Sequence, residues 1–98
     1  MCTIDYEAQQ RRLRVTGACD AGDIDAMQDA IDAFGSRAAS LIVDLTAMTG
    51  CSAEVAQAVV DSAERLTQCR VTVLRKHGTD VDRLLSEASA CSQGTPSH

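Results

Sequence analysis

The chain is poor in aromatic residues and in proline. Its 98 residues include one Tyr, one Phe, one Pro and no Trp. A core built from this sequence must therefore consist of aliphatic side chains, and the hydrophobic fraction of 45% is large enough to supply them. The length fits a single domain with a single core.

Positive charge is also scarce. Nine Lys and Arg residues stand against fourteen Asp and Glu residues, which gives a net charge of −5 at pH 7. Nucleic acids reward clustered Lys and Arg, so this balance argues against them as partners. No apolar run approaches the roughly 20 residues that span a bilayer, and the N-terminus lacks the charged-then-apolar pattern of a secretion signal. We therefore expect a cytoplasmic protein that binds neither nucleic acid nor a membrane.

The sequence contains neither a cysteine motif nor a metal-binding motif. The five cysteines are an odd number and form no C-x-x-C pair. We predict that all five are reduced thiols, because a disulfide framework or a zinc site needs paired spacings. The two histidines, His77 and His98, complete no set of metal ligands. No Gly-rich phosphate loop is visible either, so we expect no metal and no cofactor.

Short segments with strand patterns recur along the chain. Residues 3–7 and 13–16 alternate apolar and polar side chains, which indicates two half-buried strands with a hairpin turn near Gln9. Two apolar runs, 41–45 and 70–74, indicate strands that are covered on both faces. We predict that these two buried strands are adjacent and central in the sheet.

Apolar residues at helical spacing predict three helices, over 24–35, 52–66 and 79–88. Gly35 ends the first helix, and Thr79 is the expected N-cap of the last. Acidic residues off the apolar line of the first helix form a solvated face rather than a metal site. The helices therefore each offer one apolar face to a common core.

The predicted order of elements is β-β-α-β-α-β-α. The strand–helix–strand unit from 41 to 74 should be a right-handed crossover between parallel strands. We therefore predict an α/β fold: a small mixed β-sheet with helices packed mainly on one face. The domain covers residues 1–90, and the small, polar residues 91–98 form a flexible C-terminal tail.

The most informative segment is the connection between the strand over 41–45 and the helix that begins near Ser52. The first amides of a helix lack intrahelical acceptors, and the helix dipole is positive there, so such a point attracts anions and carboxylates. We predict a partner-binding site at this turn, the alternative being an ordinary strand-to-helix connection. The site comprises Thr49, Gly50, Cys51, Ser52, Ala53 and Glu54.

The pattern as a whole resembles the STAS domain family, the domains of sulfate transporters and anti-sigma factor antagonists. The resemblance runs from about residue 3 to residue 90. It rests on Leu13-Arg-Val-Thr-Gly17 leading to Asp20 and the first helix, on Leu41-Ile-Val-Asp-Leu-Thr-Ala-Met-Thr49, and on Arg70-Val-Thr-Val-Leu74 followed by Val81-Asp-Arg-Leu-Leu85. The resemblance implies an STAS-like fold and a binding role rather than catalysis.

The family's signature, Asp-Ser-Ser/Ala-Gly-Leu, is broken in this chain. Aligned without gaps, Ser52 replaces the Asp, Ala53 replaces the phospho-accepting Ser and Val55 replaces the Gly. If one residue is dropped from the turn, Ser52 becomes the acceptor and Cys51 replaces the Asp. The first alignment implies a protein without the family's phospho-switch, and the second keeps Ser52 as a phosphorylation site.

In soluble bacterial members of the family, the domain docks on an anti-sigma factor that is also a serine kinase, and so frees a sigma factor for transcription. The resemblance implies the same regulatory function and the same kind of partner for this chain. One alternative is a non-switched STAS scaffold protein in a signalling complex. Another is a thiol-based enzyme or redox sensor, in which Cys51 lies at a helix N-terminus that stabilises thiolates and His77 is its base.

Overall fold

The elements follow the predicted order in the computed structural model, which describes residues 2–93. They are β1 (Cys2–Glu7), β2 (Arg12–Ala18), the short 3₁₀ turn η1 (Ala21–Asp23), α1 (Ile24–Gly35), β3 (Ser40–Gly50), α2 (Ala53–Arg65), β4 (Arg70–Leu74) and α3 (Asp80–Gln93). The predicted tail began at residue 91, whereas α3 continues to Gln93. The remainder of that tail lies outside the described residues.

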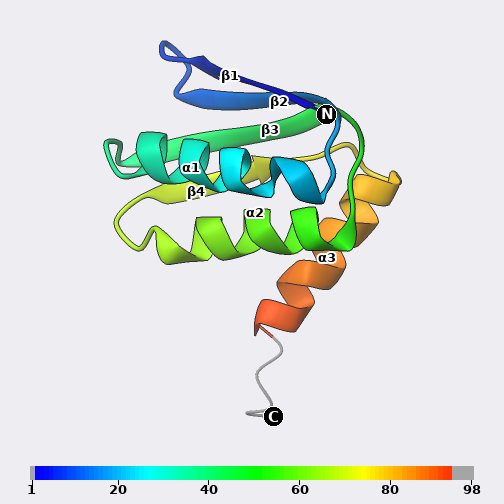
Figure 1. Ribbon diagram of the computed structural model, residues 1–98. Helices are drawn as coiled ribbons and strands as arrows, with labels where there is room; N and C mark the ends of the chain where they lie inside the picture. The colour runs from blue at the N-terminus through cyan, green and yellow to red at the C-terminus, as the bar shows by residue number, and fades with distance from the viewer. Residues whose placement is uncertain (1, 94–98) are drawn as a thin grey trace.

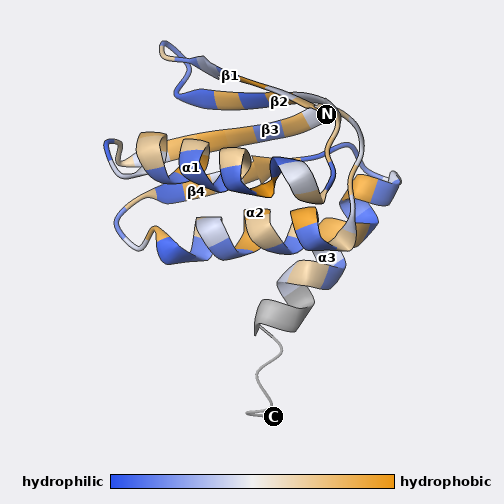
Figure 2. Cartoon of the chain, viewed as in Figure 1, coloured by the Kyte–Doolittle hydropathy of each residue, from blue (hydrophilic) through white to orange (hydrophobic). Residues whose placement is uncertain are grey.

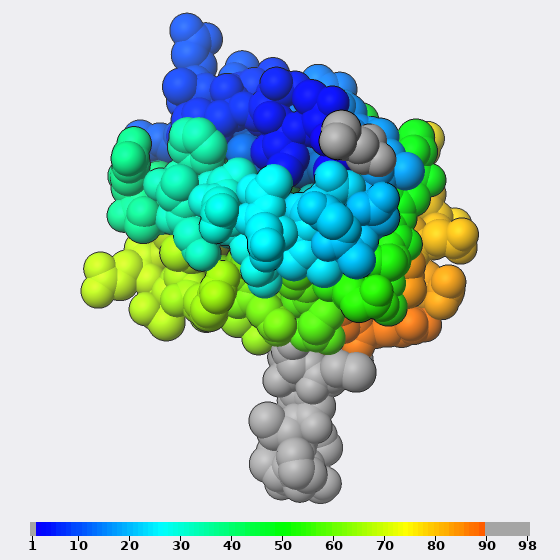
Figure 3. All heavy atoms as spheres, in the orientation of Figure 1, coloured from blue at the N-terminus to red at the C-terminus, as the bar shows by residue number. Residues whose placement is uncertain are grey.

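The four strands form one mixed sheet in the order β1-β2-β3-β4. The strands β1 and β2 pair antiparallel as a hairpin, and β3 lies parallel to both β2 and β4. The helices α1 and α2 lie side by side on one face of this sheet, and α3 packs beside α2 (Figure 1). The space-filling view shows the two helices covering the near face, with the hairpin projecting beyond them (Figure 3). The predicted fold class is confirmed.

The core is aliphatic, as the composition requires. On the two central strands, β2 and β3, the residues that alternate toward the helices are fully buried, and much of β3 is coloured as hydrophobic (Figure 2). Val43 of β3 and Val55 of α2 are 0% and 1% exposed and belong to the same buried cluster. The main members are Leu13, Val15, Met27, Ile31, Leu41, Val43, Leu45, Val55, Val59, Val81 and Leu85.

The strand β4 is adjacent to β3 as predicted, with Leu41 opposite Val71 and Val43 opposite Val73. Its predicted central position is wrong, because within residues 2–93 no strand pairs with its far side. Val71 and Val73 are accordingly only half-buried. An apolar run of five residues therefore marks a strand of this sheet without showing whether the strand is central.

The strand β3 extends five residues beyond its predicted end at Leu45. Its second half pairs with the end of β2, where Thr16 lies opposite Ala47 and Ala18 opposite Gly50. The register shifts twice along this stretch, which disturbs the alternation of apolar and polar residues that a regular strand would show. The observed turn is therefore shorter than the predicted one, and Thr49 and Gly50 belong to the strand.

The prediction that all five cysteines are reduced is wrong, because Cys2 and Cys19 form a disulfide. The hairpin places Cys2 opposite Gly17, two residues before Cys19, and the two Cα atoms are 5.0 Å apart. That separation suits a disulfide. Sequence spacing alone did not identify the pair, because strand pairing, not proximity in sequence, brings the two residues together.

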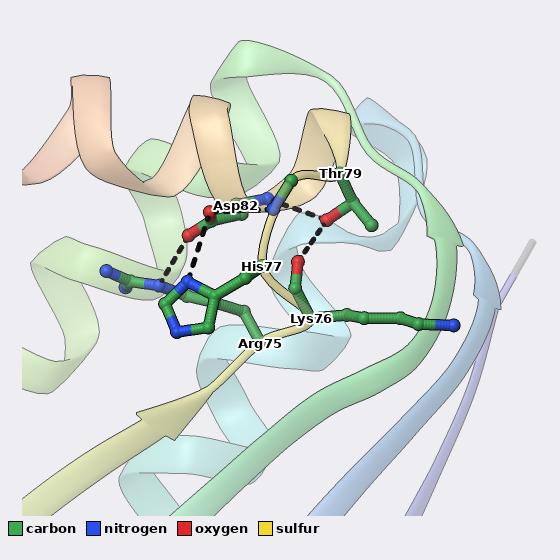
Figure 4. A network of polar contacts seen from close by, with 6 residues as sticks. Arg75, Lys76, His77, Thr79 and Asp82 are labelled. Carbon is green, nitrogen blue, oxygen red and sulfur yellow. Dashed lines mark hydrogen bonds and ion pairs between the residues drawn. The ribbon is translucent and has the colours of Figure 1, made fainter.

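A compact polar network connects the end of β4 to the start of α3 (Figure 4). The carboxylate of Asp82 accepts a hydrogen bond from Arg75 Nε at 3.0 Å and lies 3.7 Å from His77 Nδ1. The hydroxyl of Thr79 accepts a hydrogen bond from the Asp82 N–H at 3.2 Å and donates one to the Lys76 carbonyl at 2.6 Å. The predicted helix cap at Thr79 is confirmed.

Candidate functional site

The six residues of the predicted site are contiguous across the end of β3, the connection and the start of α2. Thr49 and Gly50 end the strand, Cys51 and Ser52 connect it to the helix, and α2 begins at Ala53. This connection is the green segment that descends at the right-hand side of the molecule (Figure 1). The site therefore lies at the carboxyl end of a central parallel strand, which is where ligands of open α/β sheets bind.

Ser52 is the N-cap of α2. Its hydroxyl accepts a hydrogen bond from the Val55 N–H at 3.2 Å, and its carbonyl accepts one from the Ala56 N–H at 3.1 Å. Its backbone is extended, as is usual at this position, with φ −89° and ψ 167°. The side chain is half-buried, and its hydroxyl already has a structural role as the cap of α2.

Three of the six residues are exposed: Thr49, Ala53 and Glu54. The Glu54 carboxylate lies in the first turn of α2, where the helix dipole favours a negative charge. Next to Ala53, a shallow groove of about 150 Å³ runs between α2 and α3. Its lining consists of Ala53, Gln57, Leu84, Glu87 and Ala88. The turn and the groove together form a continuous surface of mixed polarity.

Cys51 does not have the environment of a reactive thiol. Its side chain is half-buried against the core, and this burial raises the pKa of the thiol. His77 is 96% exposed and contacts Asp82, and in the described part of the chain no hydrogen bond joins it to Cys51. A raised pKa lowers the thiolate fraction at neutral pH, so the geometry opposes the Cys51–His77 pair considered from the sequence.

A buried carboxylate lies on β3 ahead of the site. The Asp44 side chain is 8% exposed, and Oδ1 accepts hydrogen bonds from the N–H (2.9 Å) and the hydroxyl (2.6 Å) of Thr46. Burial alone would raise the pKa of Asp44. The two hydrogen bonds and the positive charges of Arg12 and Arg14 outweigh that effect and lower the pKa. Asp44 is therefore a fixed negative charge that ties β3 to β2.

A larger cavity than the groove beside Ala53 lies away from the predicted site. Its volume is about 500 Å³, and it lies beyond the start of β3, between the segments 35–39 and 65–69. Because β3 begins at Ser40 and ends at Gly50, this cavity and the predicted site are at opposite ends of the strand. The cavity holds two arginines, of which Arg65 is paired with Asp32 at 3.1 Å.

Two functional candidates were missed in the sequence. Asp44 interrupts an apolar run, which is the signal that could have identified it. The second is a cluster of Cys2, Cys19 and Asp23, whose ligand-type atoms lie within 4.8 Å of one another. Counting the hairpin register back from Gln9 would have placed Cys2 near Cys19.

Among residues 2–93, no helix is both long and apolar enough to cross a membrane.

Comparison with known proteins identifies the fold. No family model matches the sequence, and no curated protein matches it significantly. Among solved structures, an anti-sigma factor antagonist from Mycobacterium paratuberculosis matches with a TM-score of 0.71 and 14% identity, over 94% of this chain and 80% of that chain. The crystal structure of Mglu matches with a TM-score of 0.62 and 16% identity, over 79% of this chain. The match spans 20% of the Mglu chain. The chain therefore has the α/β fold seen in an anti-sigma factor antagonist.

Proposed function

We propose that this protein is a regulatory binding module of the anti-sigma factor antagonist type. It docks on an anti-sigma factor that is also a serine kinase, and so controls sigma-factor-dependent transcription in the cytoplasm. The observation that carries the proposal is the fold shared with an anti-sigma factor antagonist over 94% of this chain. The absence of a reactive environment at Cys51, whose pKa burial raises, favours binding over thiol catalysis.

The proposed interface is centred on Thr49, Gly50, Cys51, Ser52, Ala53 and Glu54. Its exposed members and the groove beside Ala53 offer both polar groups and apolar surface to a partner. Such a combination of polar groups and apolar surface is typical of protein interfaces, in which a few well-packed side chains are surrounded by polar contacts. Leu84 lines the groove and supplies an apolar contact from α3.

We further propose that the interface is not switched by phosphorylation at Ala53. Aligned without gaps with the STAS signature, Ala53 occupies the phospho-acceptor position and has no hydroxyl. The adjacent Glu54 places a permanent negative charge in the same turn of α2. Ser52 has a hydroxyl, but that hydroxyl caps α2, so its phosphorylation would compete with the hydrogen bond from Val55.

The proposal is tested by measuring the affinity of a purified anti-sigma factor kinase for three variants. Ser52→Glu introduces a second carboxylate beside Glu54, and we expect it to weaken binding at least about tenfold, or 1.4 kcal/mol. Ser52→Ala removes the cap without adding charge, so it separates loss of the cap from repulsion. Ala33→Glu adds the same charge at an exposed position near the end of α1 and serves as the matched control.

Circular dichroism of each variant reports whether α2 remains folded, and a kinase assay runs alongside. We expect no phosphate transfer to wild type. Phosphorylation that Ser52→Ala abolishes would instead support the alternative alignment, in which Ser52 is the acceptor. If Ser52→Glu binds as tightly as wild type, this turn is not the interface, whatever the affinity of Ala33→Glu. If wild type binds no such kinase, the proposed function is wrong and the fold assignment stands.

A further inference from the structure

Two cysteines and a carboxylate meet at one end of the hairpin. Cys2 begins β1, Cys19 follows the end of β2, and Asp23 ends η1. One ligand-type atom from each, two sulfurs and a carboxylate oxygen, lie within 4.8 Å of one another. Cys19 is 4% exposed, whereas Cys2 and Asp23 are half-buried, so the cluster is open to solvent on one side.

Backbone contacts place the two cysteines together independently of the bond between their sulfurs. The ladder between β1 and β2 puts Cys2 opposite Gly17. The Cys19 N–H donates a hydrogen bond to the Gly50 carbonyl at 2.9 Å, which fixes Cys19 to the end of β3. These contacts involve no sulfur atom, so reduction of the disulfide leaves both thiols in the same neighbourhood.

The carboxylate is held just as firmly. Asp23 Oδ2 accepts a hydrogen bond from the Asp20 N–H at 3.0 Å, and Asp20 Oδ1 accepts one from the Gly22 N–H at 2.9 Å. This reciprocal capping arrangement leaves Asp23 Oδ1 as the oxygen available to a ligand. The carboxylate is therefore oriented before any ligand binds.

The three atoms match the ligand preferences of Zn²⁺. Zinc binds thiolate sulfur at about 2.3 Å and carboxylate oxygen at about 2.0–2.2 Å, so in a tetrahedral site the ligand atoms lie about 3.5–3.8 Å apart. In the disulfide the two sulfurs are bonded, so in the reduced protein they must move apart by about 1.7 Å to reach this spacing. The carboxylate oxygen already lies within 4.8 Å of both sulfurs and must approach by about 1 Å. Water from the open side would supply the fourth ligand.

We propose that Cys2, Cys19 and Asp23 form a binding site for a thiophilic divalent cation such as Zn²⁺ in the reduced protein, and that the disulfide is the metal-free state of this site. Binding of the cation releases one proton from each thiol and leaves both as thiolate ligands. Exchange with a low-molecular-weight disulfide forms the Cys2–Cys19 bond and releases two low-molecular-weight thiols. Metal and disulfide therefore exclude each other. This inference does not depend on the proposed function.

The test is a titration of the reduced, full-length chain with Co²⁺ under anaerobic conditions, followed by Zn²⁺. We expect one equivalent of Co²⁺ to bind and to give thiolate-to-cobalt charge-transfer absorption, which Zn²⁺ then abolishes. The oxidised protein should give no such band, because a disulfide offers no thiolate. Mass spectrometry after alkylation should show that Zn²⁺ protects Cys2 and Cys19. The extent of alkylation at Cys51 should be the same with and without the metal.

Conservative variants identify the ligands without unfolding the domain. Asp23→Asn keeps an amide oxygen that can accept the hydrogen bond from Asp20, yet removes the charge that binds the cation. Because the loss of even an outer-shell partner lowers metal affinity 10–100-fold, we expect Asp23→Asn to weaken Co²⁺ binding at least about tenfold. Asp25→Asn, an exposed carboxylate in the first turn of α1, is the matched control and should bind as wild type does.

Three results would overturn the site. The reduced wild type could show no charge-transfer band, Asp23→Asn and Asp25→Asn could bind Co²⁺ equally well, or Cys51→Ser could abolish the band while Cys2→Ser retains it. The circular dichroism spectrum of Cys2→Ser is compared with that of the reduced wild type, so that loss of metal is distinguished from loss of fold. If Cys2→Ser does not fold, the alkylation pattern of the wild type decides the question on its own.

Discussion

Asp44 allows the contribution of one buried charge to be measured directly. Both hydrogen bonds from Thr46 end on its Oδ1 atom, and Arg12 Nη1 lies 3.6 Å from its Oδ2 atom. Asp44→Asn preserves the size of the side chain and one oxygen acceptor, and removes only the negative charge. The substitution therefore tests whether the charge, rather than the shape, of this side chain stabilises the folded protein.

The expected magnitude follows from the two hydrogen bonds. A hydrogen bond to a charged group contributes about 1.5–3 kcal/mol, and a neutral one about 0.5–1.5 kcal/mol. The difference is about 1 kcal/mol per bond, so two bonds to Thr46 predict a loss of about 2 kcal/mol at pH 7. Against a typical total of about 5–15 kcal/mol, such a loss is easily measured.

The pH dependence has a definite sign. The folded protein lowers the pKa of Asp44, so its carboxylate contributes stability at pH values above the unfolded pKa of about 3.9. That contribution is lost as the pH falls through the lower, folded pKa, because the protonated carboxyl is neutral like the amide of Asn. The difference in unfolding free energy between wild type and Asp44→Asn should therefore be constant near neutrality and shrink below about pH 4.

The assay is urea denaturation followed by far-UV circular dichroism from pH 7 downward. Asp29→Asn removes an exposed carboxylate from α1 and is the control, with an expected change within about 0.5 kcal/mol at every pH. An Asp44→Asn variant that is as stable as wild type at pH 7 would refute the reasoning. So would a difference that stays the same at the lowest pH at which both proteins fold.

Three further predictions concern the core, the cap and the thiols. Val43→Asp should unfold the domain, because an unpaired buried carboxylate costs several kcal/mol, and an unchanged melting temperature would contradict the assignment of β3 to the core. Ser52→Ala should cost about 1 kcal/mol in urea denaturation because it removes the acceptor for the Val55 N–H, whereas Ser52→Gly should cost only a few tenths. Alkylation of the unfolded, oxidised protein should give two fewer adducts without reductant than with it, since Cys2 and Cys19 are joined; equal numbers would show that the bond is absent.

The fold was largely predictable because local patterns and global packing agree in this chain. Alternation in 3–7 and 13–16 predicted the hairpin, and helical spacing predicted all three helices in their observed order. The end of β3 was missed because polar residues such as Thr46 and Thr49 look like a turn, while register shifts against β2 allow the strand to continue. Patterns of period two describe regular strands and fail where a strand bulges.

The functional groups were less predictable than the fold. The turn at Ser52 could be located, because an N-cap residue before an apolar stripe is a local signal. The meeting of Cys2 with Cys19 depends on strand register, and the ion pair between Asp44 and Arg12 joins residues of two neighbouring strands. Such properties belong to pairs of residues that are distant in the sequence, and spacing rules for single segments do not contain them.

The two aromatic residues of the chain stack on each other. The rings of Tyr6 on β1 and Phe34 on α1 are 3.9 Å apart between centroids and within 9° of parallel. Since the sequence has no Trp, Tyr6 is its sole strong ultraviolet fluorophore. Its emission and near-ultraviolet dichroism therefore report on the docking of the N-terminal strand against α1. A detachment of β1 alone would give the same optical signal as complete unfolding, and only a probe of the helices, such as far-ultraviolet dichroism, distinguishes the two events.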